Sequence, residues 1–497
     1  MMRFALTVGC CLVLAARCAV AAGGAQSAAP DSTNPPRTDL IRSAELMKTV
    51  EFLASKPLAG RLAGSPGYWK AASAMAARFQ ALNLAAGGIN SFFQPLEIEY
   101  ETIPTCRLAI VDAAGSKHEL RLGPDFTCRG LTGSGRFTAP VVFAGYGVSD
   151  SGGYDDYAGL DVRGKIVLLL KEPPPFRRDS SGWGRDLLPR PKARIAAAHG
   201  ARAMLLVSRP LQPEPQAPIG SMLEGDGPEN ERFPMLQVSD SVAQLVLKPA
   251  GLDLRALEAE IDSTRTPHSR ALDVSAEIDV RAHYRARQPS ANVVGILYGT
   301  DPKLTEEALV IGAHLDHVGS QGSIYFPGAN DNASGAAGVV AVAEAFARGP
   351  RPRRTVIFAL FTSEESGLDG SKRFVEHPPV PLDKIVAYFN LDCVGRGDSI
   401  RVGGGTRSPQ LWRIARDLDA KSTRLMVETS GSGGGADAAP FAAKRIPTLY
   451  FDTKNSYTFL HLPGDAPGTL NPPLYEALVR LVYGTAWRVA QGGYTGG

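Results

Sequence analysis

Carboxylate and imidazole side chains follow four apolar runs in the second half of the chain. The first run leads into His314, and the later runs lead into Glu364 and Glu365, into Asp392 and, after a short loop, into His461. In parallel α/β sheets, ligands bind at the carboxyl ends of the strands, where the loops gather. Imidazoles and carboxylates suit zinc and, less selectively, cobalt or manganese. The pattern therefore predicts that these side chains converge on a metal site.

A further acid lies between the first and the second run. The segment GANDNASG presents Asp331 directly before the apolar helical stretch AAGVVAVAEAF. Two imidazoles and three or four carboxylates exceed what one tetrahedral catalytic ion with an open water position needs. They fit two ions, about 3.5–4 Å apart, that share one bridging carboxylate. Glu364 and Glu365 are adjacent and leave a strand end, so one can bind metal while the other accepts a proton from water.

Each of these residues has an ordinary structural explanation when it is taken alone. A single aspartate at a strand end usually caps a helix or forms a turn. Paired glutamates usually belong to a solvated face, and His314 alone would more often be a structural histidine than a ligand. The occurrence of ligand-type residues at four successive strand ends favours the metal site.

The elements that must position these residues can be inferred from the apolar pattern. From about residue 285 onward, apolar runs alternate with helical stretches, which is typical of an α/β fold with a largely parallel sheet. Upstream, residues 43–84 have helical spacing broken by a glycine-rich turn at 58–67. Residues 93–131 alternate between apolar and polar in short runs, which indicates strands. Prolines crowd residues 209–234, which predicts a long surface loop.

Four segments carry a resemblance to a known family. GAHLDHVG, GANDNASGAAG, SEESGLDGS and NLDCVG occur in order and at familiar spacing, and residues 285–395 thereby resemble the di-zinc aminopeptidases of metallopeptidase family 28. The resemblance implies a mostly parallel mixed sheet flanked by helices, the zinc exopeptidase fold. It also implies a cis bond between Asp331 and Asn332. Two zinc ions per chain would be held by five ligands: His314, Asp331, Glu365, Asp392 and His461.

The same resemblance implies a role for each residue of the centre. Asp331 would bridge both ions, and Glu364 would be the general base. Asp316 would orient the ring of His314, since metal-bound histidines commonly need such a partner. The resemblance assigns no metal to His317, which we expect to line the pocket or to pack.

Two positions depart from the pattern of the family. Relatives often carry histidine after the aspartate of the segment GGGADAAPF, and tyrosine directly before the last histidine. Here Ala438 and Leu460 occupy those places, and Tyr457 is the nearest substitute for the tyrosine. His377 is a rival fifth ligand, but it lies in a proline-stiffened loop well before the fourth run. His461 is therefore favoured.

An inserted domain is predicted between two parts of the peptidase domain. YGVSDSGGYDDYAGLDVRGKIVLLL, followed by AAAHGARAMLLV, resembles the β-rich protease-associated (PA) domain found within many of these peptidases. The resemblance implies a lid or a wall that selects substrates, and a spacer is the alternative. LAGRLAGSPGYWKAASAMAARF resembles the opening helix of the family. We therefore expect a signal peptide, a flexible leader, a first peptidase segment, the PA domain and the main peptidase segment at 1–22, 23–38, 39–132, 133–270 and 271–497.

The first 22 residues are typical of an export signal. Arg3 precedes an apolar stretch from Phe4 to Ala16, and the sequence Ala-Val-Ala at 19–21 offers a cleavage site. The stretch is too short for a stable membrane anchor, and Arg17 before Cys18 argues against lipidation. We therefore expect an extracytoplasmic protein, either periplasmic or secreted. The net charge of +3 is spread along the chain, which gives nucleic acid binding no electrostatic support.

The cysteines leave two interpretations open. Cys106 and Cys128 flank a predicted hairpin. In an oxidising compartment they can pair, but two buried free thiols fit the sequence equally well. Cys393 is then unpaired.

Three functions fit the sequence to different degrees. The favoured one is a secreted, zinc-dependent aminopeptidase acting on peptides with a free N-terminus. A glutamate-carboxypeptidase type of exopeptidase shares the zinc ligands and the inserted domain, but such relatives carry a further helical domain. Here 36 residues follow His461, with one helix expected at 473–489. A receptor-like binding protein without catalysis would lack ligands, and none of the five is missing. The sequence leaves the oligomeric state open.

Overall fold

A computed structural model describes residues 35–149, 153–177, 188–220, 227–427, 433 and 435–495. The predicted export signal at 1–22 and most of the predicted leader lie outside these residues. Within the described part of the chain, no helix is both long enough and apolar enough to cross a membrane.

The main sheet has a parallel centre with one antiparallel neighbour on each side. Its strand order is β15–β16–β14–β10–β13–β9. The four central strands are β10 (Ala308–His314), β13 (Thr355–Phe361), β14 (Ile385–Leu391) and β16 (Thr448–Lys454). They pair in parallel, whereas β9 (Arg270–Leu297) and β15 (Ser399–Gly403) run antiparallel to their neighbours. All residues of β10 and β13 are buried, as in a sheet covered on both faces.

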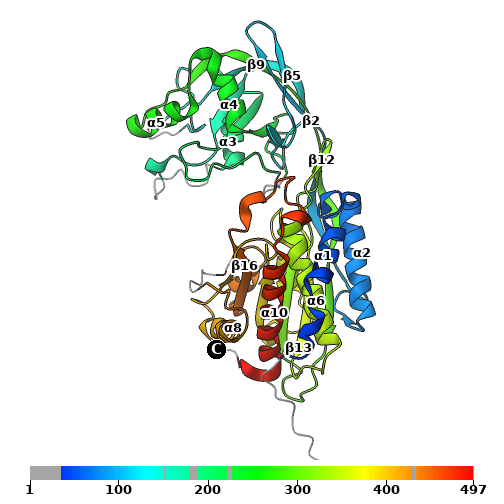
Figure 1. The fold of residues 1–497 in the computed structure, drawn as a ribbon. Helices are drawn as coiled ribbons and strands as arrows, with labels where there is room; N and C mark the ends of the chain where they lie inside the picture. The colour runs from blue at the N-terminus through cyan, green and yellow to red at the C-terminus, as the bar shows by residue number, and fades with distance from the viewer. Residues whose placement is uncertain are drawn as a thin grey trace, which may run out of the picture. The chain divides into compact units, whose positions relative to one another are not determined.

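Helices cover both faces of this sheet, which confirms the predicted fold class. One face packs against α1 (Ser43–Leu53), α2 (Pro66–Ala81), α6 (Gly335–Ala347), α8 (Pro409–Lys421) and α10 (Pro472–Arg488). The other face packs against α7 (Asp369–Glu376) and α9 (Ala438–Ala443). Figure 1 shows α1 and α2, in blue, beside α6. The N-terminal helices therefore belong to the same core as the second half of the chain.

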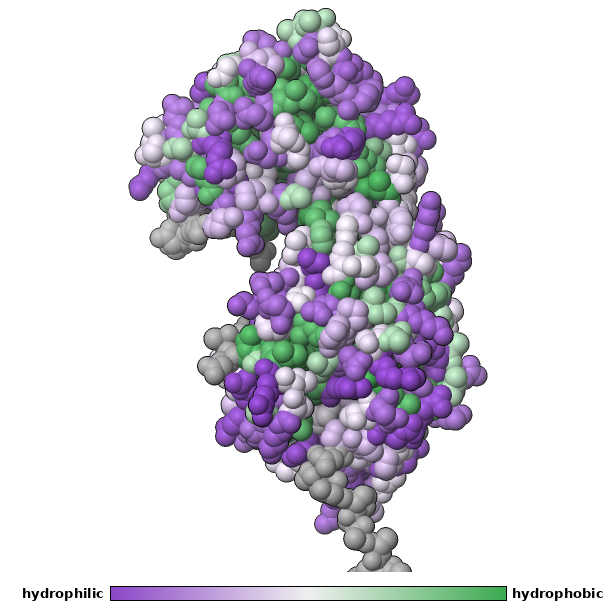
Figure 2. Space-filling model, in the orientation of Figure 1, coloured by the Kyte–Doolittle hydropathy of each residue, from purple (hydrophilic) through white to green (hydrophobic). Residues whose placement is uncertain are grey.

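A second core is built from the middle of the sequence. Its strands are β5 (Gly135–Phe143), β6 (Ile166–Leu170), β7 (Ala203–Val207) and β8 (Met235–Val238), which pair in parallel, with β4 (Phe126–Cys128) antiparallel to β8. Helices α4 (Asp240–Leu247) and α5 (Leu254–Thr264) pack on one face, and α3 (Pro189–Ala198) packs on the other. Figure 2 shows that hydrophilic residues dominate the visible face of the molecule, as expected when the apolar residues fill these cores.

Two long antiparallel strands connect the cores. They are β2 (Phe93–Asp112) and β9, which pair from Phe93 with Val293 to Asp112 with Val274. The remaining short strands are β1 (Ala85–Ala86), β3 (Lys117–Glu119), β11 (Ser320–Gln321) and β12 (Ile324–Tyr325). A disulfide joins Cys106 of β2 to Cys128 of β4, and Cys393 is a buried free thiol. Of the two interpretations of Cys106 and Cys128, the structure has the paired one.

A buried carboxyl on β2 gives a prediction for the pH dependence of stability. Glu101 is 3 % exposed; its Oε2 accepts a hydrogen bond from the Thr132 N–H at 3.3 Å, and its Oε1 has no hydrogen-bond partner among the described residues. Burial raises the pKa of Glu101 from its ordinary value to about 8. At a pH between the ordinary pKa of a glutamate, 4.5, and the raised pKa, the folded chain keeps a proton on Glu101 that the unfolded chain has lost. The free energy of unfolding therefore falls as the pH rises through this range.

Glu101→Gln removes this dependence. The unsubstituted protein should lose on the order of 3 kcal/mol in free energy of unfolding through Glu101 when the pH is raised from 5 to 9, and the variant should not lose it. The difference in free energy of unfolding between the two proteins should therefore shift by this amount in favour of the variant. Denaturant unfolding at the two pH values measures the shift. Glu97→Gln, at an exposed position of the same strand, is the matched control and should show no such shift. An equal effect of Glu101→Gln at both pH values would contradict the expectation.

Candidate metal centre

The structure brings the predicted ligands together at the carboxyl edge of the parallel strands. His314 is the last residue of β10, and Asp392 directly follows β14. Glu365 lies shortly after β13, and His461 lies in the loop after β16. Asp331 lies in the irregular segment Ala329–Ser334 that leads into α6. The bond between Asp331 and Asn332 is cis, as the family resemblance predicted.

A first donor group consists of His314, Asp331 and Asp392. The Nε2 atom of His314 lies 3.2 Å from Oδ1 of Asp331 and 3.6 Å from Oδ1 of Asp392. All three residues are buried, and one ligand atom from each lies within 4.8 Å of the others. The hydroxyl of Tyr450 donates to Oδ2 of Asp392 at 2.6 Å, which fixes that carboxylate.

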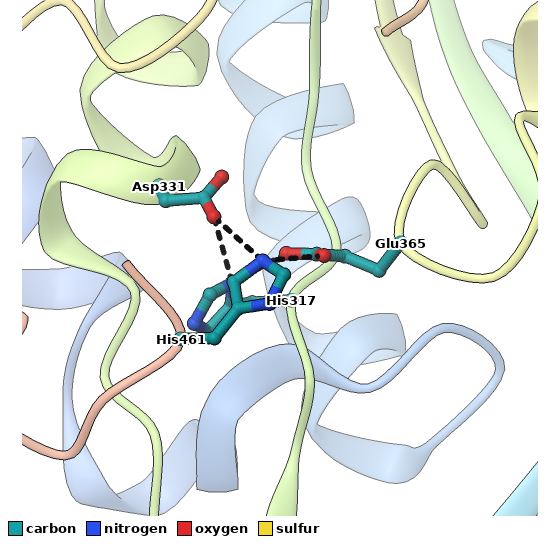
Figure 3. Close-up of side chains that lie close together, drawn as sticks. All are labelled: His317, Asp331, Glu365 and His461. Atoms are coloured by element: carbon teal, nitrogen blue, oxygen red, sulfur yellow. Dashed lines mark hydrogen bonds and ion pairs between the residues drawn. The ribbon is translucent and has the colours of Figure 1, made fainter. Parts of the chain in front are cut away.

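A second donor group consists of His317, Asp331, Glu365 and His461 (Figure 3). The Nε2 atom of His461 lies 3.1 Å from Oδ2 of Asp331 and 2.9 Å from Oε2 of Glu365. Asp331 thus directs Oδ1 toward the first group and Oδ2 toward the second. A bridging carboxylate needs this arrangement.

His317 and His377 lie differently with respect to the site. His317, which we expected to line the pocket or pack, has Nδ1 2.7 Å from Oε1 of Glu365. His377, the rival fifth ligand, directly follows α7 and belongs to no donor group among the described residues. The backbone carbonyl of His377 accepts a hydrogen bond from the amide of Gln94.

Glu364 lies beside the first donor group. Its Oε2 atom is 4.0 Å from Nε2 of His314, and Glu364 forms a further set of three possible donors with His314 and Glu365. The carboxylate of Asp316 accepts hydrogen bonds from the backbone N–H groups of Glu364 and Glu365, at 3.2 and 3.4 Å. Asp316 therefore fixes the backbone of the glutamate pair.

The geometry around His314 differs from the one that the resemblance implied. Nδ1 of His314 lies 3.9 Å from the carboxylate of Asp316, which is beyond hydrogen-bonding distance, and 3.3 Å from the backbone carbonyl of Asp316. The carbonyl therefore holds the ring in this structure, because the carboxylate is used by the two glutamate N–H groups. Orientation of His314 by the Asp316 carboxylate stays a prediction.

The charges of the site favour cations. Burial works to lower the pKa of His314, but Glu364, Asp331 and Asp392 raise it well above its ordinary value. Burial also works to raise the pKa of Glu365, but His461 and His317 lower that pKa to about 2. The carboxylates also raise the pKa of His461 well above its ordinary value, so the protonated forms of His314 and His461 are favoured and balance the carboxylates. Metal binding should displace these protons, because ligands bind metal in their deprotonated form, and the donor set fits zinc.

Arg61, which was not among the predicted site residues, connects the loops of the site. Its fully buried guanidinium donates hydrogen bonds to the carbonyls of Leu315, Pro327 and Gly328, and to that of Leu53. Leu315 directly follows the ligand His314, and Pro327 and Gly328 lie shortly before Asp331. Arg61 therefore fixes the distance between the two ligand-bearing loops. The glycine-rich turn was visible in the sequence, but nothing there indicated these partners.

Two further residues position the site without having been predicted. The carboxylate of Asp465 accepts hydrogen bonds from the backbone N–H groups of Asn330 and Asp331, at 2.9 and 3.0 Å. The backbone N–H of Gly220, from the inserted region, donates to the carbonyl of His461 at 2.9 Å. Tyr457 hydrogen-bonds to Asp452 at 3.4 Å. The contacts of Asp465 and Gly220 join residues far apart in the sequence, so no local pattern indicated them. The contact of Tyr457 is local, because Asp452 lies near the end of β16 in the same segment of the chain.

An open α/β sheet with carboxylates and imidazoles gathered at its carboxyl edge is typical of proteins that bind divalent metal ions. Two segments of the sequence match known families: residues 292–486 match peptidase family M28, and residues 137–246 match the PA domain. These matches confirm both predicted resemblances, with the PA segment placed before the M28 segment.

Individual relatives agree with this assignment. Aminopeptidase YwaD of Bacillus subtilis (strain 168) is 24% identical over 340 residues, which cover 66% of this chain and 62% of the relative. A probable glutamate carboxypeptidase, LAMP1 of Arabidopsis thaliana, is 30% identical over 169 residues, covering 30% of this chain and 24% of the relative. Both matches span less than two thirds of the relative's own length.

The fold has solved counterparts. The structure of BSAP, a zinc aminopeptidase from Bacillus subtilis, aligns with a TM-score of 0.61 at 21% identity and covers 92% of this chain and 97% of its own. At that identity the likeness establishes the fold, a mixed α/β sheet with an added PA domain.

Proposed function

We propose that this chain is a two-zinc aminopeptidase that hydrolyses the N-terminal peptide bond of peptides. The observation that carries the proposal is the position of Asp331, whose two oxygens face two separate sets of donors. His314 and Asp392 would bind one ion, Glu365 and His461 the other, and Asp331 both. When bound, zinc supplies Lewis acidity, which lowers the pKa of water and polarises a carbonyl oxygen.

Glu364 is the proposed general base. It would take a proton from water and later pass it to the leaving amine. Burial raises the pKa of Glu364 well above its ordinary value, against the lowering effect of His314. A raised pKa suits a carboxylate that must accept a proton near neutral pH. Asp316 would support Glu364, because its carboxylate holds the backbone N–H of this residue.

The predicted division of the chain is retained as part of the proposal. Residues 39–132 and 271–497 would form the peptidase domain, which is supported by the single core that α1, α2 and α6 share. Residues 133–270 would form the inserted PA domain. A role for this insert as a wall of the substrate site is supported by the hydrogen bond from Gly220 to the carbonyl of His461.

Export by the signal at 1–22 is proposed as well. The disulfide between Cys106 and Cys128 supports an oxidising compartment, because such bonds persist outside the cytoplasm and are rare within it. Periplasmic and fully secreted destinations both satisfy this argument.

An aminopeptidase is preferred over a carboxypeptidase because this chain covers more of the aminopeptidase relative's own length. It covers 62% of the aminopeptidase relative and 24% of the probable glutamate carboxypeptidase. A second glutamate carboxypeptidase relative aligns over the same 66% of this chain as the aminopeptidase does, but only 50% of that relative is covered. A receptor-like protein without catalysis is disfavoured, because the five proposed ligands and the base are all present.

A panel of chromogenic aminoacyl anilides tests the proposal. The protein should hydrolyse anilides with a free amino group and leave their N-acetylated counterparts intact. A zinc chelator should abolish the hydrolysis, and added zinc should restore it. Release of the C-terminal residue from amino-blocked dipeptides would instead assign a carboxypeptidase. If the purified protein contained no metal and cleaved neither substrate, the result would instead support a receptor-like binding protein without catalysis.

A further inference from the structure

His317 lies inside the second donor group and not at its edge. Its side chain is fully buried, with Nδ1 2.7 Å from Oε1 of Glu365 and 3.8 Å from Oδ2 of Asp331. The ring packs edge-to-face against that of His461, with 5.5 Å between the centroids. Figure 3 shows the four side chains of the group facing one another. One donor atom from each lies within 4.8 Å of the others.

We propose that His317 is a fourth protein ligand of the second metal ion. The inference rests on the proposed two-metal function and adds a ligand to it. With His317, the second donor group offers two imidazoles and two carboxylates, which is a complete tetrahedral set for zinc. Nε2 of His317 has no hydrogen-bond partner among the described residues. The ring therefore makes its polar contacts through Nδ1, on the side that faces the donor group.

The proposal makes the two ions unequal. Sites with four protein ligands hold zinc as a closed structural ion, whereas sites with three keep a position for water. The second group would be closed by His317, Asp331, Glu365 and His461. The first donor group offers three ligands, namely His314, Asp331 and Asp392. Water would then be activated beside the first group, where Glu364 also lies, and the second ion would be the more tightly held.

The competing explanation is that His317 only donates a hydrogen bond to Glu365. Replacing His317 with asparagine separates the two roles, because the Asn amide keeps an N–H near the position of Nδ1 but offers no imidazole lone pair. Loss of a residue that merely supports a ligand typically weakens metal binding by about 10–100-fold. Loss of a ligand should exceed that range.

Metal content and zinc affinity are therefore measured for the unsubstituted protein, for His317→Asn and for a control variant, His377→Asn. His377 is exposed and lies outside both donor groups. The unsubstituted protein and His377→Asn should each bind two ions. His317→Asn should keep one and lose more than about 100-fold in affinity for the other. A smaller loss overturns the proposal.

X-ray absorption of the unsubstituted, zinc-loaded protein gives a second test that needs no variant. Three histidines shared between two ions support the proposal, and two histidines overturn it. Failure of this inference is distinguishable from failure of the proposed function. If the protein binds two ions through only two histidines, the ligand assignment of His317 alone is wrong. If it binds no ion, the metal centre and this inference are both wrong.

Discussion

Glu364→Gln is expected to keep both metal ions and to lose about 10³-fold in kcat, because a positioned general base contributes typically about 10²–10⁴-fold. Glutamine has the shape of glutamate but cannot accept the proton of the attacking water. The donors that share Asp331 do not include Glu364, so their geometry should persist. Steady-state hydrolysis of an aminoacyl anilide, combined with zinc analysis of the same preparation, measures both effects.

The matched control is Glu364→Asp, which restores a carboxylate at a shorter reach. Its kcat should lie between those of the unsubstituted protein and of Glu364→Gln. Glu364 also forms a set of possible donors with His314 and Glu365, so the zinc analysis decides between base and ligand. Loss of one ion together with activity would assign Glu364 as a ligand. Near-normal kcat with both ions bound would exclude it as the base.

Much of the fold could be predicted because the main sheet is covered on both faces. Strands β10 and β13 are buried along their whole length, so they stand out in the sequence as continuous apolar runs. The ligand candidates directly behind those runs, such as His314 and Asp392, follow from the rule that sites form at the carboxyl ends of parallel strands. Asp331 and His461 lie in loops; the residue pattern made them candidates for the site, but their particular ligand roles depended on the family resemblance.

The long strands β2 and β9 could not be predicted in full. Residues 93–131 were expected to form short strands, whereas β2 runs unbroken from Phe93 to Asp112. Proline argues against a strand interior because it donates no backbone hydrogen bond. Here the register with β9 shifts between Thr102 and Thr105, which accommodates Pro104. Helices α4 and α5 of the insert were also missed, since the resemblance there covered only the neighbouring strands.

The residues that support the site were missed because their contacts are not local. The guanidinium of Arg61 reaches the carbonyl of Gly328, 267 positions further along the chain. His317 was expected to pack or to line the pocket, since the family resemblance gave it no metal. Its proximity to Glu365 depends on how β10 and β13 are aligned. Only the fold brings such partners together.

Asp331→Ala is expected to abolish binding of both metal ions, and with it all hydrolysis. The two oxygens of Asp331 face Nε2 of His314 and Nε2 of His461, at 3.2 and 3.1 Å. Removing one carboxylate therefore removes a donor from each group. Affinity for each ion should fall by more than about 100-fold, beyond the loss that follows removal of a supporting residue. Equilibrium dialysis followed by zinc analysis measures this.

Two controls separate a bridging residue from an ordinary ligand. Asp392→Ala removes a donor from the first group only, and His461→Ala removes one from the second group only, so each should lose one ion and keep the other. Added zinc should raise the unfolding temperature of the unsubstituted protein, because an ion that binds only the folded state stabilises it. Added zinc should raise the unfolding temperature of Asp392→Ala and of His461→Ala by a smaller amount. It should leave the unfolding temperature of Asp331→Ala unchanged. If Asp331→Ala loses one ion alone, Asp331 belongs to a single site, and the two ions do not share a carboxylate.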